Sequence, residues 1–247
     1  MKKYIALLGL TAALIGGHVQ AQTGFPTDPA SRQISVKTSP GIKTKSIPQA
    51  SLRKARLNML AKREISETDL RALAEYGDGL AALKYVRILV SRHHGQREHA
   101  SDIAYFGAVA VGDGRVWPLQ DMIDAMHSLS PKTEPKARIR KYISVLYPHA
   151  WAGNSLALDA LIDFNGKGKL FGELSEKTRQ RILEQSKKNG VGRVELRMAV
   201  NILTKPEPTL IDKRQAHRYL TLAAATKNLA IKATAENLLR LLDADKT

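Results

Sequence analysis

The 247-residue chain contains no cysteine. This absence excludes disulfide scaffolds, thiolate zinc sites, iron–sulfur clusters, cysteine nucleophiles and lipid attachment through an N-terminal cysteine. Aromatic residues make up only 5% of the chain, whereas 43% of its residues are hydrophobic and 25% are charged. This balance is sufficient for a folded core and excludes a membrane bundle or a low-complexity polymer.

Acidic residues are missing from residues 1–21, where two lysines precede an apolar run over residues 4–15 and small residues lead up to Ala21. The apolar run is shorter than the roughly 20 residues that span a bilayer, so a transmembrane anchor is the weaker interpretation. The pattern predicts a secretory signal peptide that is cleaved after Ala21. We therefore expect an exported protein, periplasmic or secreted, with no membrane span.

Basic residues outnumber acidic ones, and the formal net charge is +16. Residues 22–65 hold nine basic residues against two acidic ones. Within this stretch, residues 22–48 contain four prolines, many Ser and Thr residues and few apolar ones, which predicts a disordered basic tether. We expect the basic residues between positions 32 and 63 to hold the protein to an anionic surface, and not to nucleic acid, because no recognition motif accompanies the charge.

From Gln49 onward the apolar residues recur three and four positions apart, with no sustained strand-like alternation, which predicts an all-α domain over residues 49–247. Ser66 and Ser175 predict the N-termini of two helices. Apparent helix breaks follow at Gly77, Gly112, Gly153, Gly190 and Lys227, with spacings of 35, 41, 37 and 37 residues. A spacing this regular predicts an array of antiparallel helix pairs that bury one another's apolar faces.

Two stretches give the array a family resemblance: Ala152-Gly153-Asn154 with the later Gly166-Lys167-Gly168 loop, and Ala216-His217-Arg218-Tyr219 running into Ala223-Ala224. They resemble the Sel-one-like repeat family, which is related to the tetratricopeptide repeat. The resemblance covers about four and a half units between Leu70 and Leu242, although Pro148 interrupts one unit and Lys227 replaces a closing glycine. Its repeat-defining residues are Gly77, Gly112, Gly153, Asn154, Gly166, Gly168 and Gly190. The resemblance implies a right-handed α-solenoid that holds a protein partner in its groove, as a scaffold, adaptor or regulator.

Several motifs that suggest chemistry are better explained by structure. The cluster His93-His94 with His99 suggests a metal site, but Gly95 favours a solvated turn. Gly166 to Lys169 is followed by Leu170, so it is not a phosphate loop. Ser155 is predicted to cap a helix, because no strand precedes it as a nucleophile elbow requires. The carboxylates of Asp121, Asp124, Glu173 and Glu176 are expected on solvated helix faces or starts. We predict no catalytic residue, no metal and no cofactor, and do not expect an enzyme.

Partner binding is assigned to exposed aromatic and basic residues. These candidates are Trp117, Tyr219, Arg53, Lys54 and Arg56. The favoured hypothesis is an exported adaptor or regulator of an envelope-associated process that binds a protein partner. The alternative is direct binding of anionic polysaccharide or lipid phosphate, which would weaken steeply with salt. An envelope hydrolase is the third and weakest hypothesis.

Overall fold

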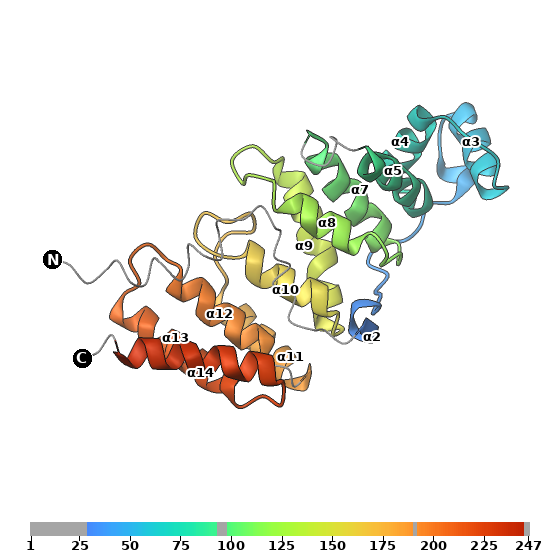
Figure 1. The fold of residues 1–247 in the computed structure, drawn as a ribbon. Helices are drawn as coiled ribbons and strands as arrows, with labels where there is room; N and C mark the ends of the chain where they lie inside the picture. The colour runs from blue at the N-terminus through green and yellow to red at the C-terminus, as the bar shows by residue number, and fades with distance from the viewer. Residues whose placement is uncertain (1–28, 93–97, 190–191, 245–247) are drawn as a thin grey trace.

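The computed structural model describes residues 29–92, 98–189 and 192–244 (Figure 1). Within these residues, the β-type pairing consists of an isolated bridge between Asn165 and Gly172. The helices are α2 (Pro29–Arg32), the short 3-10 helix η1 (Thr44–Ser46), α3 (Ala50–Leu60), α4 (Glu67–Glu75), α5 (Gly79–Ser91), α7 (Ala100–Gly112), α8 (Leu119–Met126), α9 (Lys136–Trp151), α10 (Ser155–Phe164), α11 (Glu176–Asn189), α12 (Arg193–Leu203), α13 (Leu210–Ala224) and α14 (Leu229–Ala244). The predicted all-α class is confirmed.

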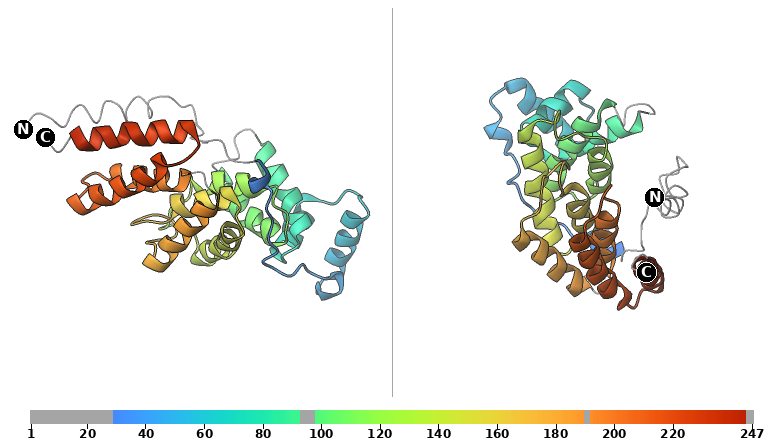
Figure 2. Two further views of the ribbon diagram at one scale, coloured as in Figure 1. Left: turned by 90° about the horizontal axis from the view of Figure 1, so that it is seen from below. Right: turned by 90° about the vertical axis from the view of Figure 1, so that its left-hand side faces the viewer.

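The helices follow one another in two layers (Figures 1 and 2). In one layer α4, α7, α9 and α11 contact each other in this order, and in the other α8, α10, α12 and α14 do so. Helices adjacent in the chain also pack in pairs, such as α4 with α5, α7 with α8, α9 with α10 and α13 with α14. These contacts between consecutive helix pairs are compatible with the predicted helical repeat.

Four of the five predicted breaks lie where one helix ends and the next begins. Gly77 and Gly153 occupy the turns after α4 and α9 with φ angles of 93° and 101°. Such a left-handed backbone costs an L side chain about 1 kcal/mol, which glycine avoids. Gly112 is the last residue of α7, and Lys227 lies between α13 and α14. Gly190 lies outside the described residues. The predicted loop glycines, Gly166 and Gly168, lie after α10, also with positive φ.

Side-chain caps begin several helices. The hydroxyls of Ser66 and Ser175 each accept the N–H three residues later, at 3.1 and 3.2 Å, so both predicted helix starts are confirmed. The prediction that Ser155 caps a helix was wrong, because Ser155 is the first residue of α10. The cap is Asn154, whose side-chain oxygen accepts the N–H of Ala157 at 3.0 Å. The Asn side chain accepts this bond and still has two N–H donors, whereas a serine hydroxyl has one O–H donor.

Helix α7 is enclosed by α4, α5, α8 and α9, which all contact it. Small residues allow this close packing: a Cβ atom on Gly107 would lie 2.8 Å from the Cβ of Met122 in α8. Phe106 packs edge-on against Tyr85 of α5, with ring centroids 5.0 Å apart. Tyr105, beside it, remains partly exposed. Helix α7 is therefore packed on several sides, and its partly exposed side chains, such as Tyr105, lie on the layer of α4, α7, α9 and α11.

Residues 32–43, from the last residue of α2 to the residue before η1, form a segment that we call the strap and that contains no helix from Ile34 onward (Figure 1). Its exposure alternates like that of a strand: Gln33, Ser35 and Lys37 are exposed, whereas Ile34 and Val36 between them are partly buried. The strap runs along the turns of the helix pairs, because it contacts in succession the turn after α9, the end of α7 and the turn after α4.

The array holds the strap mainly through its backbone. The side-chain amide of Asn154 donates to the C=O groups of Arg32 and Ile34, at 3.0 and 2.8 Å. Farther along, two successive strap N–H groups donate to the C=O of Gly112, at 2.8 and 2.9 Å. A Cβ atom on Gly112 would lie only 3.1 Å from the Oγ of Ser39, so a glycine there leaves room for the strap.

The strap differs from the disordered tether that was predicted for residues 22–48. From Pro29 onward the segment is ordered against the array, and Ile47 at its end is 1% exposed. Residues 22–28 lie outside the described residues. The prediction weighed only the apolar content of the segment itself, whereas the helix ends and turns of the array supply the partners that offset the entropy cost of ordering it.

His149 of α9 is fully buried and binds the strap. Its Nε2 accepts the N–H of Val36 at 3.1 Å, so the ring proton lies on Nδ1, which donates to the C=O of Val145 at 2.8 Å. Burial lowers the pKa of His149, because the charged imidazolium is poorly solvated there. A protonated ring would also lose the acceptor that Val36 requires.

We expect acid to destabilise the protein through His149. Its pKa in the folded state lies below the ordinary 6.5, so the unfolded chain binds the proton more readily. Stability is therefore lost as the pH falls below 6.5 toward the folded-state pKa. One such group changes the free energy of unfolding by at most about 1.4 kcal/mol per pH unit. Urea denaturation near neutral pH and about two units lower measures this change. In His149→Gln the difference between the two conditions should shrink, and an undiminished difference would contradict the assignment.

Candidate functional site

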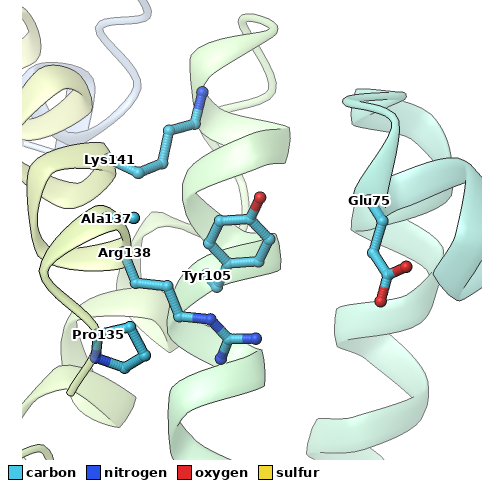
Figure 3. Close-up of a pocket in the computed structure, with 6 residues that line it drawn as sticks. All are labelled: Glu75, Tyr105, Pro135, Ala137, Arg138 and Lys141. Carbon is cyan, nitrogen blue, oxygen red and sulfur yellow. The ribbon is translucent and has the colours of Figure 1, made fainter.

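An open groove with a volume of about 530 Å³ lies on the layer of α4, α7, α9 and α11, between α4, α7 and α9 (Figure 3). Its lining residues are Glu75, Tyr105, Pro135, Ala137, Arg138 and Lys141. Figure 3 shows Tyr105, Arg138 and Lys141 on the neighbouring helices α7 and α9, with Glu75 across the groove on α4. The groove thus combines two cations and an aromatic ring on one side with a carboxylate on the other.

Arg138 is held in place by three partners from α7. Its guanidinium pairs with the carboxylate of Asp102 at 2.9 Å and donates to the hydroxyl of Ser101 at 2.5 Å. It also lies over the ring of Tyr105, 4.7 Å from the centroid, which is within the range of a cation–π interaction. Because these contacts fix the side chain, Arg138 presents a preorganised surface to the groove.

A buried hydrogen-bond network links α7 and α9 next to the groove. The phenol of Tyr142 is fully buried and donates to Glu134 at 2.6 Å, and the hydroxyl of Ser101 donates to the same carboxylate at 3.1 Å. Burial raises the pKa of Tyr142, and its hydrogen bond to Glu134 acts in the same direction. Tyr142 therefore stays protonated and remains a donor, which locks the α9 side of the groove.

Lys141 is the groove cation with the weakest compensation. Its side chain is partly buried, and its Nζ donates to the Oγ of Ser39 in the strap at 3.0 Å. Among the described residues, no carboxylate lies within 4.0 Å of this ammonium group. Burial lowers the pKa of Lys141, because the charged ammonium group is poorly solvated there. An anionic group in the groove would compensate the charge of Lys141.

Glu75 provides the opposite rim. Its carboxylate accepts from the guanidinium of Arg71 at 3.1 Å, one helical turn earlier on α4, and this hydrogen bond is the main reason why the pKa of Arg71 is raised. Arg71 also approaches Asp102 of α7 at 3.9 Å. The ion pairs of Arg71 with Glu75 and Asp102, and of Asp102 with Arg138, therefore connect α4, α7 and α9.

Two of the predicted basic candidates, Arg56 and Arg53, bind groups of the protein itself. Arg56 pairs with Asp78 at 2.6 Å and donates to the C=O of Ile42 at 3.1 Å. Arg53 donates to two backbone carbonyls just before α3, at 2.7 and 2.8 Å. Lys54 is exposed and forms no ion pair among the described residues. Of these three candidates, Lys54 therefore offers the freest charge to a partner.

The two aromatic candidates differ in exposure. Trp117 is 61% exposed in the turn between α7 and α8, where its ring lies 4.6 Å below the guanidinium of Arg87, and it does not line the groove. Tyr219 is 7% exposed in α13, and its hydroxyl accepts from Gln215 at 3.2 Å. Trp117 is thus accessible to a partner as a separate surface feature, whereas Tyr219 mainly packs in the core.

Tyr105, Arg138 and Lys141 were not predicted as site residues from the sequence. A signal existed, because residues 136–142 contain four cations over two turns of helix. The prediction weighted the denser charge near the N-terminus instead. The partner ring of Tyr105 lies 33 residues upstream of Arg138, and only the packing of α7 on α9 brings the two together.

None of the described residues from the histidine and carboxylate motifs lines the groove. His99 precedes α7, and His93 and His94 lie outside the described residues. The described part of the chain contains no cluster of three His, Asp or Glu residues that could hold a metal ion. Asp121 and Asp124 lie on α8, where burial, followed by the charge of Asp124, raises the pKa of Asp121. Glu173 and Glu176 are exposed near the start of α11.

None of the helices in the described residues is long and apolar enough to cross a membrane. Comparison with known proteins gives no match: no family model, no curated protein and no solved structure is significantly similar to this chain. The function is therefore inferred from the geometry of the groove and from the charges around it.

Proposed function

We propose that this protein is an exported helical-repeat scaffold that acts by binding a protein partner, as an adaptor or regulator of an envelope-associated process. Its array would be a right-handed α-solenoid of about four and a half units of the Sel-one-like type, beginning at α4. The layered contacts of α4, α7, α9 and α11 support this arrangement. The signal peptide predicted over residues 1–21 supports export and lies outside the described residues.

The groove between α4, α7 and α9 is the proposed partner site, and its occupant is an acidic segment of the partner. The observation that carries the proposal is Lys141, a partly buried ammonium group that no carboxylate neutralises within the described residues. A carboxylate from a partner would compensate this charge, while the ring of Tyr105 and the exposed faces of Pro135 and Ala137 would supply apolar contact. Charge-assisted hydrogen bonds of this kind are stronger than neutral ones.

Reversing the charge at Lys141 should weaken partner binding. The mature chain, tagged and immobilised, is used to recover proteins from an envelope extract of its host at moderate salt, and the recovered partner is then titrated against Lys141→Glu. We expect affinity to fall by at least about tenfold, because a charge-assisted hydrogen bond is replaced by repulsion. Circular dichroism and a melting curve establish that the variant is folded.

Lys136→Glu provides the matched control, because this residue lies on the same helix, is exposed and does not line the groove. It should bind the partner as the unmodified chain does. Equal binding by Lys141→Glu would overturn the groove as the site. Loss of binding in Trp117→Ala, with Lys141→Glu unaffected, would move the site to the turn between α7 and α8.

A further inference from the structure

Helix α3 lies at the end of the array, where it packs on α4 and η1 (Figure 1). Its inner face is formed by Leu52, Ala55 and Met59, which are all buried. These three residues recur at three- and four-residue spacing, so they define one stripe of the helix. The opposite face of α3 has no partner among the described residues, and its side chains decide what the end of the molecule can contact.

Two leucines lie on this outer side of α3. Leu57 is 57% exposed and Leu60 is 50% exposed. Polar residues are usual on the solvated face of a helix, whereas both of these positions are apolar. Leu57 is also five residues from Leu52, which places it nearly opposite the centre of the buried stripe. The outer face of α3 therefore offers apolar surface directly to whatever meets this end of the molecule.

Cations surround the two leucines. Lys54 is one turn before Leu57, and Lys62 and Arg63 come two and three residues after Leu60, the last residue of the helix. All three side chains belong to exposed residues and form no ion pair among the described residues. In contrast, Arg53 and Arg56 of the same helix use their guanidinium groups within the protein, on backbone carbonyls and on Asp78. The charges that remain free are thus those that border the exposed leucines.

The backbone at Lys62 adds an independent observation. Lys62 follows Ala61, the C-cap of α3, in the left-handed conformation with a φ of 59°, and it is the one non-glycine residue with positive φ in the described part of the chain. Glycine or asparagine is the usual residue at this position of a helix end. A lysine therefore adopts an unfavourable backbone conformation two residues after Leu60.

We propose that the outer face of α3 docks on the surface of a bilayer rich in anionic lipids. The axis of α3 would lie along the surface, with Leu57 and Leu60 inserted between headgroups and with Lys54, Lys62 and Arg63 at the level of the lipid phosphates. Apolar residues bordered by cations are the pattern of helices that bind at a membrane interface. A free phosphate or an anionic polysaccharide would use the cations but would leave the leucines exposed, so the leucines favour lipid.

This docking does not involve the groove. The basic residues between positions 32 and 63 were predicted from the sequence to contact an anionic surface, and the proposal assigns that contact to one face of α3. The strap, which holds several of those basic residues, lies along the turns of the array, and Arg56 is paired with Asp78. The protein could therefore bind a partner in the groove while α3 contacts lipid.

Co-sedimentation with vesicles tests the proposal. The mature chain is mixed with vesicles that contain about one third phosphatidylglycerol, or with vesicles of phosphatidylcholine alone, at low and moderate salt. We expect binding only to the anionic vesicles. Leu57→Ser/Leu60→Ser should weaken it roughly tenfold, because two half-exposed leucines lose their apolar burial. Lys54→Gln/Lys62→Gln/Arg63→Gln should weaken it by about 100-fold, at roughly fivefold per cation.

Matched variants elsewhere control for general hydrophobicity and charge. Leu222→Ser/Leu241→Ser removes two leucines of similar exposure from α13 and α14, and Lys177→Gln/Lys188→Gln/Lys227→Gln removes three exposed cations. The leucine control should bind like the unmodified chain, and the charge control should lose far less binding than the α3 triple variant. Lys141→Glu should also retain vesicle binding, which separates this inference from the groove. Absence of binding to anionic vesicles would overturn the proposal, and so would unchanged binding of the α3 leucine variant.

Discussion

Asn154→Ala is expected to lower the free energy of unfolding by about 3 kcal/mol. The side chain of Asn154 is fully buried and makes three hydrogen bonds: it caps α10 through its oxygen and binds two strap carbonyls through its nitrogen. An N-cap contributes about 1 kcal/mol, and each further hydrogen bond contributes a similar amount. Urea denaturation of the purified variant measures the loss.

Asn154→Asp separates the cap from the strap. An aspartate still accepts the N–H of Ala157, and its charge is favourable at a helix N-terminus. It cannot donate, however, and it would place a carboxylate oxygen against the C=O groups of Arg32 and Ile34. We expect the strap to become accessible to protease in this variant while the helices remain folded. A strap as protected as in the unmodified chain would show that the Asn154 amide does not hold it.

Arg193→Met should be as destabilising, by about 3 kcal/mol or more, because it breaks a buried ion pair from one side. The side chain of Arg193 in α12 is 7% exposed and pairs with Asp159 of α10 at 3.1 Å. Without it, the one ion pair that Asp159 keeps among the described residues is the one with Arg197, at 3.8 Å. Burial already raises the pKa of Asp159, against the opposing effect of the two arginines. Removing one arginine raises this pKa further.

The pH dependence distinguishes a lost ion pair from lost packing. When the pKa of a carboxyl group is higher in the folded state than in the unfolded state, the folded state binds the proton more readily and stability increases as the pH falls. The deficit of Arg193→Met should therefore shrink as the pH approaches the ordinary Asp value of 3.8. A deficit that stays constant with pH would indicate packing alone.

Arg179→Met is the control for this prediction. Arg179 pairs with Glu176 three residues earlier on α11, and both side chains are substantially exposed. A solvated pair of this kind contributes less than about 1 kcal/mol, so the variant should unfold almost as the unmodified chain does. Equal losses in Arg179→Met and Arg193→Met would contradict the importance of burial between α10 and α12.

The helix pairs were predictable because their signals act locally. The hydroxyls of Ser66 and Ser175 cap helices through N–H groups three residues away, and Gly77 and Gly153 provide left-handed turns within a single residue. Interactions of this range depend on neighbours in the chain, which a sequence pattern contains. The regular spacing of these signals added the helix-pair organisation.

The strap was missed because its partners are far away in the sequence. The alternation of Ile34 and Val36 with exposed residues was present, but it is short and bordered by prolines. Its hydrogen bonds reach His149 and Asn154, which lie 113 and 120 residues from their partners. No local rule assigns such partners, so a segment that orders against a distant surface has the same sequence signature as one that stays disordered.

The sequence by itself determined the helical class, the positions of most turns and the concentration of positive charge near the N-terminus. Only the tertiary structure decided which charges remain free. Arg56 is neutralised by Asp78, whereas Lys54 and Lys141 have no carboxylate partner among the described residues. The reason is that helix periodicity and capping operate over about four residues, while the electrostatics of a side chain depends on the group that packing places opposite it.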